Sequence, residues 1–245
     1  MHPGWSRAVD QLAQTLPLRA FSALRERGPR YAWHKALRKT LGRWPGLKRR
    51  FVYRDPRRYW TLRGGDDYFR EQEDQPARDL RARWLAQRIA AYRPASILEV
   101  GCGYGKQLRA LREHLDVPLV GVDFSPSQIE QAKRYLRDCG DIEVFLGSGD
   151  RLPFADHSFD LVLTSAVILH NPPPIAEAIR REVIRVSRRW TAHNEDTDVS
   201  YNRFGYNTAE WYASHELRVV ECRAIPVGSN DPAHSQFCVV EPWPR

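Results

Sequence analysis

The stretch Ile97-Leu98-Glu99-Val100-Gly101-Cys102-Gly103-Tyr104-Gly105-Lys106 decides the fold of this chain. Its first four residues predict a short buried parallel strand, and the pattern over 107–111 predicts a helix. Glycine has no Cβ, so three glycines at alternate positions let the backbone turn sharply and let a ligand lie directly against it. The stretch therefore predicts a strand, a ligand-binding loop and a helix, in that order.

The loop's spacing, acid-x-Gly-x-Gly-x-Gly, differs from the dinucleotide fingerprint, whose last glycine comes one residue later. By itself it is also compatible with a plain turn between a strand and a helix. A second expected strand, 118–122, leads into Asp123, where a carboxylate can accept hydrogen bonds from both ribose hydroxyls. A third, 143–146, precedes Gly149 and Asp150, where a carboxylate can accept an adenine amine. The expected fourth strand covers 159–164.

Together these motifs resemble the class I S-adenosylmethionine-dependent methyltransferases, and the resemblance covers roughly residues 95 to 242. It implies an α/β fold with a seven-stranded, mostly parallel, Rossmann-like sheet. The last two strands, expected at 217–225 and 236–241, would form an antiparallel hairpin at its edge. The implied cofactor is S-adenosylmethionine, with expected binding residues Glu99, Gly101, Cys102, Gly103, Gly105, Asp123, Phe124, Gly149, Asp150, Arg151 and Ser165.

A methyl group on a sulfonium is already activated, so such an enzyme mainly holds the acceptor in line with it. An alcohol acceptor must also lose a proton, for which histidine is the commonest general base. Two histidines are expected at the carboxyl ends of strands, where open parallel sheets bind ligands. His170 follows the fourth strand, and His193 follows a fifth strand expected at 189–192. We expect one of them to be the base.

The polar loops around these histidines favour oxygen as the acceptor atom, in a hydroxylated small molecule or a saccharide. The run 201–208 interleaves aromatic rings with amides and a guanidinium, which suits a polyol, although a surface loop with packed aromatic rings would have the same pattern. The resemblance also implies that the segment before the first strand folds over the cofactor. The expected substrate-binding residues are Tyr59, Tyr68, Glu195, Tyr201, Asn202, Arg203 and Tyr206.

A magnesium ion is possible but not favoured. Glu195, Asp196 and Asp198 offer the hard oxygen ligands that magnesium prefers, but Thr164 and Ser165 stand where metal-dependent relatives carry a third acid.

Methylation of a nucleobase amine is not favoured either. The prolines at 172–174 lack the aromatic residue of that motif, and we expect them to begin a helix over 175–186.

Charge divides the chain unevenly. Residues 1–60 hold fifteen Lys and Arg against three acids, a net charge of +12, so the chain's total of +8 leaves −4 for residues 61–245. We expect a basic helical extension and lid at 1–94 and the methyltransferase domain at 95–245. The spacing of apolar residues from Trp5 to Leu16 predicts an amphipathic helix at the start of the extension.

The role of the basic extension stays open at the level of the sequence. It can contact nucleic acid, an anionic membrane surface or an acidic substrate, or it can pack on the domain or on a second subunit of a homo-oligomer. Nucleic acid is possible but not favoured. Two other functions remain alternatives: an RNA or protein methyltransferase steered by the extension, and a non-catalytic interaction protein on the same fold.

The four cysteines lack Cys-x-x-Cys spacing and suggest neither a zinc site nor a disulfide framework, so we expect a reducing cytoplasm. No apolar run reaches the length of a transmembrane segment, and the amino terminus lacks the apolar stretch of a signal peptide.

Overall fold

The computed structural model describes residues 18–41, 44–64, 66–228 and 233–243. The chain divides into two compact units, Met1–Leu62 and Arg63–Arg245. The amphipathic helix expected between Trp5 and Leu16 lies outside the described residues.

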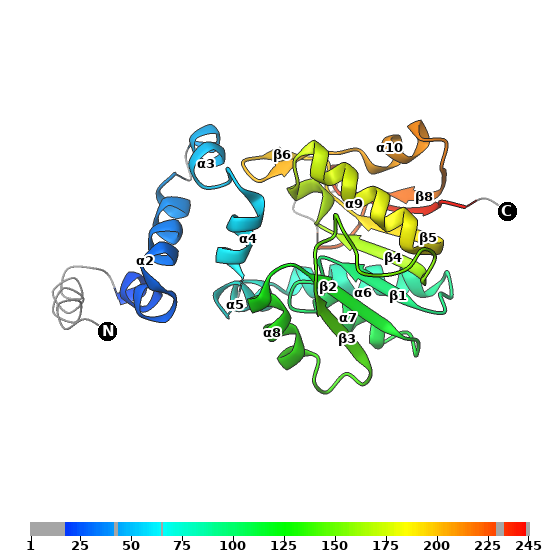
Figure 1. Cartoon of the computed structure of the whole chain (residues 1–245), viewed down its shortest axis with the longest axis horizontal. Coiled ribbons are helices and arrows are strands. Elements are labelled where there is room, and N and C mark those ends of the chain that lie inside the picture. Colours follow the sequence, from blue (N-terminus) through cyan, green and yellow to red (C-terminus); the bar gives the residue numbers. More distant parts are fainter. Residues whose placement is uncertain (1–17, 42–43, 65, 229–232, 244–245) are drawn as a thin grey trace. The chain divides into compact units, whose positions relative to one another are not determined.

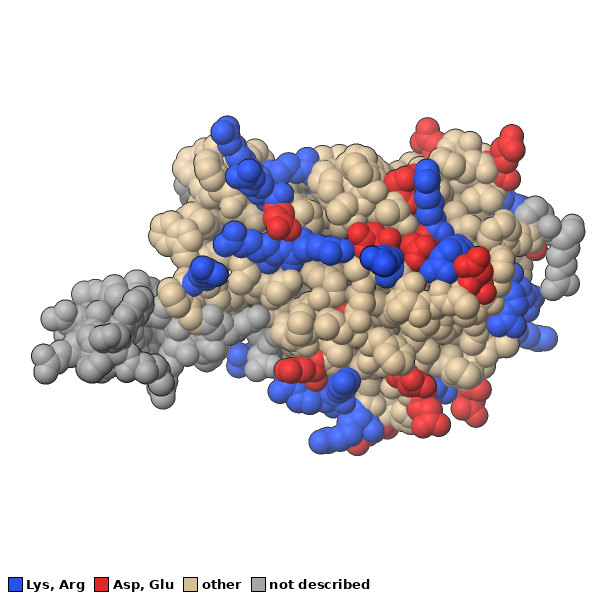
Figure 2. Space-filling view, in the orientation of Figure 1, with Lys and Arg blue, Asp and Glu red and all other residues tan. Residues whose placement is uncertain are grey.

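The first unit is helical in its described part, with α2 (Leu18–Thr40), α3 (Pro45–Phe51) and most of α4 (Pro56–Arg63). α2 is interrupted at Gly28, whose φ of 81° is left-handed. The break falls there because Pro29 removes a helical N–H and disfavours the helical conformation of the residue before it. Aromatic rings pack edge to face between these helices, with Tyr59 against His34, Tyr53 and Trp60. Figure 2 shows Lys and Arg side chains over α3.

The second unit contains the remaining elements (Figure 1). Its helices are α5 (Asp66–Glu73), α6 (Pro76–Ala90), α7 (Lys106–Arg112), α8 (Pro126–Tyr135), the 3-10 helix η2 (Ile168–His170), α9 (Pro173–Val186) and α10 (Thr208–Ser214). Its strands are β1 (Ile97–Val100), β2 (Leu119–Asp123), β3 (Ile142–Leu146), β4 (Phe159–Ser165), β5 (Ser187–Asn194), β6 (Val199–Ser200), β7 (Arg203–Phe204), β8 (Arg218–Arg223) and β9 (Phe237–Glu241).

In the described residues, seven of these strands form one sheet in the order β3-β2-β1-β4-β5-β9-β8. The first five in that order pair in parallel, and β9 and β8 are antiparallel to their neighbours. This confirms the expected α/β fold with a mostly parallel seven-stranded sheet and an antiparallel hairpin at one edge. Strands β6 and β7 form a separate two-stranded hairpin.

Both faces of the sheet are apolar, which is why its central strands are mostly hydrophobic. Successive residues of β1 alternate between the faces: Ile97 packs with α6, α7 and α8, and Leu98 packs with α9. Figure 1 shows α9 on the other side of the sheet from α6 and α7. Helices thus cover both faces of the sheet, and the loops that follow the parallel strands lie at the edge where the carboxyl ends of these strands meet.

Two helix starts agree with the sequence. α9 begins with Pro173 and Pro174 in its first turn, so the prolines begin a helix as expected. α10 begins after Asn207, whose side chain accepts a hydrogen bond from the backbone N–H of Glu210 at 3.2 Å.

The sheet edge holds one pairing that the sequence did not indicate. Cys222 in β8 and Cys238 in β9 stand directly opposite one another and form a disulfide. The cysteine spacing suggested no disulfide framework and gave no sign of this single pair. The pairing depends on the register of two strands that are 16 residues apart at this point, and cysteine spacing alone does not encode that register.

Among the described helices, none combines the length and the apolar composition that crossing a bilayer requires.

We predict that Gly101→Ala lowers the free energy of unfolding more than Gly140→Ala. Both glycines have left-handed φ values, 71° and 75°, so each alanine costs about 1 to 2 kcal/mol of backbone strain. At Gly101 the new Cβ would also overlap Val167, whereas nothing lies within 4 Å at Gly140. The overlap should add roughly 1 to 3 kcal/mol. Urea unfolding of the two variants measures the difference, and equal stabilities would contradict the packing given for Gly101.

Candidate active site

The glycine loop after β1 is fixed by backbone hydrogen bonds to the neighbouring strand. The N–H groups of Gly101 and Cys102 donate to the carbonyl of Val122 at 2.7 and 3.0 Å. The Gly103 N–H donates to Asp123 Oδ2 at 3.0 Å, and Gly105, with φ of 91°, begins α7. The loop after β1 is thereby held against the end of β2.

Only part of this loop faces open space. A Cβ on Gly101 would overlap Val167, and a Cβ on Gly105 would come within 2.6 Å of Leu136. At Gly103, with φ of 55°, the nearest atom would be Gln128 Nε2 at 3.8 Å. The first and third glycines are thus required by the protein's own packing, and Gly103 presents its backbone to a space that a ligand can occupy.

Two buried carboxylates lie beside the loop. Glu99 is 3% exposed, and its Oε2 is buried with no hydrogen-bond partner. Burial and the nearby Asp123 charge raise the pKa of Glu99 well above its usual range. Burial raises the pKa of Asp123 to about 6, although N–H groups of Ser125 and Gly103 stabilise its ionised form. Within the described part of the chain, neither acid has a salt-bridge partner.

These acids fit the donor groups of S-adenosylmethionine, which are an ammonium and two ribose hydroxyls. Glu99 has the unmatched acceptor oxygen for the ammonium, and Asp123 lies where ribose hydroxyls are expected. Cys102 can contribute only its backbone, because its side chain is buried against the position of Gly121, and burial raises the pKa of its thiol. Phe124 is half-buried at the turn between β2 and α8.

The third strand leads to the residues expected around the adenine. Asp150 accepts a hydrogen bond from Ser148 Oγ. Gly149 packs against β1, since a Cβ there would come within 2.7 Å of Val100. Arg151 is exposed, and its backbone forms an isolated bridge with Ser148. Ser165, at the end of β4, accepts a hydrogen bond from Asn194 Nδ2 at 2.7 Å.

His193 lies inside β5, not after it, because the strand runs two residues further than the sequence indicated. The side chain is fully buried, with Nδ1 2.9 Å from Thr164 Oγ1 and Nε2 3.0 Å from Thr191 Oγ1. Burial and the nearby Arg180 charge lower the pKa of His193 to about 3. A neutral imidazole with both nitrogens hydrogen-bonded to threonine hydroxyls acts as part of the core.

His170 closes η2, directly beyond the end of β4. Its Nδ1 lies 2.6 Å from the carbonyl oxygen of Asn202. Because a carbonyl only accepts, Nδ1 carries the proton and Nε2 carries the lone pair of the neutral ring. Burial lowers the pKa of His170 to about 4, against the opposite effect of the bond to Asn202. His170 is therefore neutral at pH 7 and has the tautomer of a base acting through Nε2.

The side chain of Glu195 accepts hydrogen bonds from the backbone of the turn before His170, which its position in the sequence did not indicate. Its Oε1 accepts the N–H groups of Val167 and Ile168 at 3.1 and 3.2 Å, and its Oε2 accepts the N–H of Leu169 at 3.1 Å. The carboxylate thus caps η2 and fixes the turn that carries His170. Burial raises the pKa of Glu195, and these N–H donors partly offset that effect.

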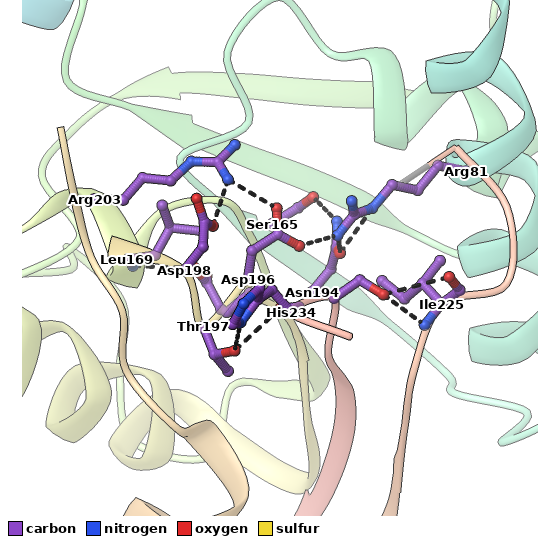
Figure 3. A network of polar contacts seen from close by, with 12 residues as sticks. Arg81, Ser165, Leu169, Asn194, Asp196, Thr197, Asp198, Arg203, Ile225 and His234 are labelled. Atoms are coloured by element: carbon purple, nitrogen blue, oxygen red, sulfur yellow. Dashed lines mark hydrogen bonds and ion pairs between the residues drawn. The ribbon is translucent and has the colours of Figure 1, made fainter. Parts of the chain in front are cut away.

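Alternating charges connect the ends of β4 and β5 with the segment before β1 (Figure 3). Arg81 of α6 donates to Asn194 Oδ1 through Nε and Nη2, at 3.1 and 2.5 Å, and its Nη2 also lies 2.7 Å from Asp196 Oδ1. Arg203 pairs with both Asp196 and Asp198, at 3.4 and 2.5 Å. The role of Arg81 could not be predicted from the sequence, since one arginine on a helix carries no signal of a partner more than a hundred residues away.

This network does not fit a magnesium site. Asp196 and Asp198 point to arginines, and Glu195 is taken up by backbone N–H groups. Across the described ranges, no three His, Cys, Asp or Glu side chains come together as a metal site.

Residues 201–206, expected to contact the acceptor, include the turn of the β6–β7 hairpin and strand β7, and they contact the His170 turn. Tyr206 donates from its hydroxyl to the Asn171 carbonyl at 2.8 Å, and the Asn202 backbone holds His170. Tyr201, which directly precedes Asn202 in the turn of the hairpin, is half-buried. Tyr59 belongs to the first unit, where its ring packs in the aromatic cluster described above.

Tyr68 lies on α5, which is fixed to the glycine loop by a second cluster. The rings of Tyr68 and Phe69 pack edge to face against Tyr104, with centroids 6.4 and 5.0 Å apart. Glu73 accepts hydrogen bonds from Tyr104 Oη and Lys106 Nζ, both at 3.0 Å. The segment before β1 therefore packs directly on the glycine loop.

Comparison with known proteins agrees with this geometry. A family model described as a methyltransferase domain matches residues 97–189. An O-methyltransferase of Aspergillus nomiae, rstn1, is 31% identical over 115 residues, which cover 46% of this chain and 49% of that protein. A sterol 24-C-methyltransferase of Aspergillus fumigatus, erg6, is 30% identical over 106 residues, covering 42% of this chain and 28% of that one. The chain spans about half the length of these relatives or less.

A solved structure has the same fold. Magnesium protoporphyrin IX methyltransferase from Synechocystis PCC 6803, solved with bound S-adenosylmethionine, aligns with a TM-score of 0.57 over 85% of this chain and 96% of that one, at 13% identity. The matched residues 97–189 include the glycine loop, Asp123 and the turn around Asp150. Residues 97–189 therefore match a methyltransferase domain, and the fold is that of a methyltransferase solved with bound S-adenosylmethionine.

Proposed function

We propose that this protein transfers a methyl group from S-adenosylmethionine to a hydroxyl oxygen of a small molecule or a saccharide, with His170 as the general base. When bound, the cofactor supplies an activated methyl group. The protein's part is to hold the cofactor and the acceptor in line and to take the proton from the acceptor.

The polar character of the ends of β4 and β5 supports this kind of acceptor. Asn194, Asp196, Asp198, Arg81 and Arg203 offer amide, carboxylate and guanidinium groups there. A sterol-like acceptor would instead need a predominantly apolar lining. The similarity to the sterol methyltransferase spans 28% of that protein, so it does not favour a sterol acceptor.

The surroundings of the two histidines favour His170 over His193 as the base. His170 sits on a turn directly after β4, with its Nδ1 proton oriented by Asn202 and the whole turn fixed by Glu195. His193 has both nitrogens on threonine hydroxyls in the core. We therefore propose the catalytic role for His170 and a packing role for His193.

The proposed cofactor residues are the loop from Glu99 to Gly105, the ends of β2 and β4, and the turn after β3. Glu99 would accept the cofactor's ammonium, and Asp123 its ribose hydroxyls. Tyr201, Asn202, Arg203 and Tyr206 are proposed for the acceptor. Glu195, with its carboxylate on backbone N–H groups, is proposed as a support of the His170 turn.

We predict that the affinity for S-adenosylhomocysteine rises with pH through about 6 and then levels off. The pKa of Asp123 is raised to about 6, so its carboxyl is protonated below that pH. An ionised carboxylate accepts hydroxyl hydrogen bonds more strongly than a protonated one. Asp123→Asn should bind about ten- to a hundredfold more weakly and lose this pH dependence, as measured by titration of tryptophan fluorescence.

A matched control for that variant is Asp160→Asn. Asp160 is also buried, but it accepts the Ala95 N–H at the opposite end of the sheet from the glycine loop. It should keep wild-type affinity and the wild-type pH profile. An Asp123→Asn variant with an unchanged pH profile would show that another group controls cofactor binding.

We predict that His170→Gln lowers turnover about 10² to 10⁴-fold, the usual contribution of a general base, without weakening S-adenosylhomocysteine binding. His193→Gln should keep turnover per folded molecule.

Because the pKa of His170 is lowered to about 4, wild-type kcat should stay constant from pH 8 to pH 6 and fall only toward pH 4. Release of S-adenosylhomocysteine with a panel of sugars and phenols as acceptors measures these rates.

Mass spectrometry of the product should find the added methyl as an ether. If His170→Gln turns over at the wild-type rate, His170 is not the general base. If the methyl group is found on carbon or nitrogen, the acceptor atom is not oxygen.

A further inference from the structure

The first unit carries a solvent-exposed apolar surface that its own fold does not use. α3 has no buried residue, and Trp44, Leu47 and Phe51 are 56%, 46% and 62% exposed. Leu47 and Phe51 are four residues apart and lie on one side of the helix, and Trp44 directly precedes the helix as its N-cap residue. Trp33 on α2 is 68% exposed. Large apolar side chains gathered in this way mark an interaction surface.

Positive charge surrounds this apolar stripe. α3 contains Lys48, Arg49 and Arg50 in its last turn, and Arg54, Arg57 and Arg58 follow as exposed residues. Residues 1–60 carry fifteen Lys and Arg against three acids. The partner of this surface must therefore be both anionic and able to take up apolar side chains.

We propose that α3 and the basic residues after it form a docking surface for anionic phospholipid membranes, with Trp44, Leu47 and Phe51 inserted at the level of the headgroups. A short helix with an apolar stripe and basic flanks is the pattern of interfacial membrane helices. Tryptophan concentrates at that depth of the bilayer, and each basic residue adds attraction to anionic lipids. Such a surface would hold the protein at the level of the lipid headgroups.

Other occupants fit less well. The same surface of a second copy would bring two strongly basic faces together. RNA would match the charges, and its bases could stack on tryptophan and phenylalanine. It would leave Leu47 in water, because an aliphatic side chain offers no ring to stack on.

The test is sedimentation of the full-length protein with vesicles of phosphatidylcholine alone and of phosphatidylcholine mixed with phosphatidylglycerol. We expect binding to the mixed vesicles only. Combined replacement of Trp44, Leu47 and Phe51 by Ser should weaken binding at least about tenfold, because it removes the apolar contacts. Arg49→Glu with Arg50→Glu should weaken it by about fivefold or more for each charge removed.

A pair of leucine variants separates a membrane from RNA. Leu47→Ser should weaken vesicle binding, whereas Leu80→Ser should not, since Leu80 is 57% exposed on α6 of the other unit. Unchanged helix content by circular dichroism would show that the first unit of each variant is folded, and unchanged S-adenosylhomocysteine binding would show the same for the second unit. The proposal is overturned if the mixed vesicles do not retain the protein, if the triple serine variant binds them like wild type, or if the protein binds RNA but not vesicles.

Discussion

The buried carboxylate of Asp123 joins the glycine loop after β1 to the turn after β2. One oxygen accepts the Gly103 N–H and the other accepts the Ser125 N–H, so the glycine loop and the turn after β2 are fixed to each other. The carboxylate is only 8% exposed, and an ionised group with few partners at such depth is costly. Because burial makes the ionised form of Asp123 costly, it raises the pKa of this carboxyl. Hydroxyl donors from a bound ribose would reduce that cost, which is the physical reason to expect a ligand there.

A second constraint orders the acceptor side of the site. Glu195, from the end of β5, caps η2, and Arg81, from α6, binds both Asn194 and Asp196. Three segments far apart in the chain thereby fix the turn that carries His170. On the cofactor side, α5 packs on Tyr104 and Glu73 binds Lys106. The segment before β1 therefore supports both halves of the site, and a change in it should affect cofactor and acceptor together.

The sequence predicts the cofactor half of this protein better than the acceptor half. The first strand, the glycine loop and Asp123 lie within about thirty residues of one another, and local patterns of that kind predict the fold directly. The extent of β5, the cap formed by Glu195, the partners of Arg81 and the Cys222–Cys238 pairing depend on contacts between distant segments. No periodicity encodes them. His193 illustrates the difference, because a shift of two residues in the strand end changes a candidate base into a core residue.

A crystal structure of the protein with S-adenosylhomocysteine would test the roles of Asp123 and the glycine loop. The adenosyl group should lie against Gly103, with both ribose hydroxyls within hydrogen-bond distance of the Asp123 carboxylate and the amino group at Glu99. A ligand bound elsewhere, or a ribose turned away from Asp123, would contradict these roles.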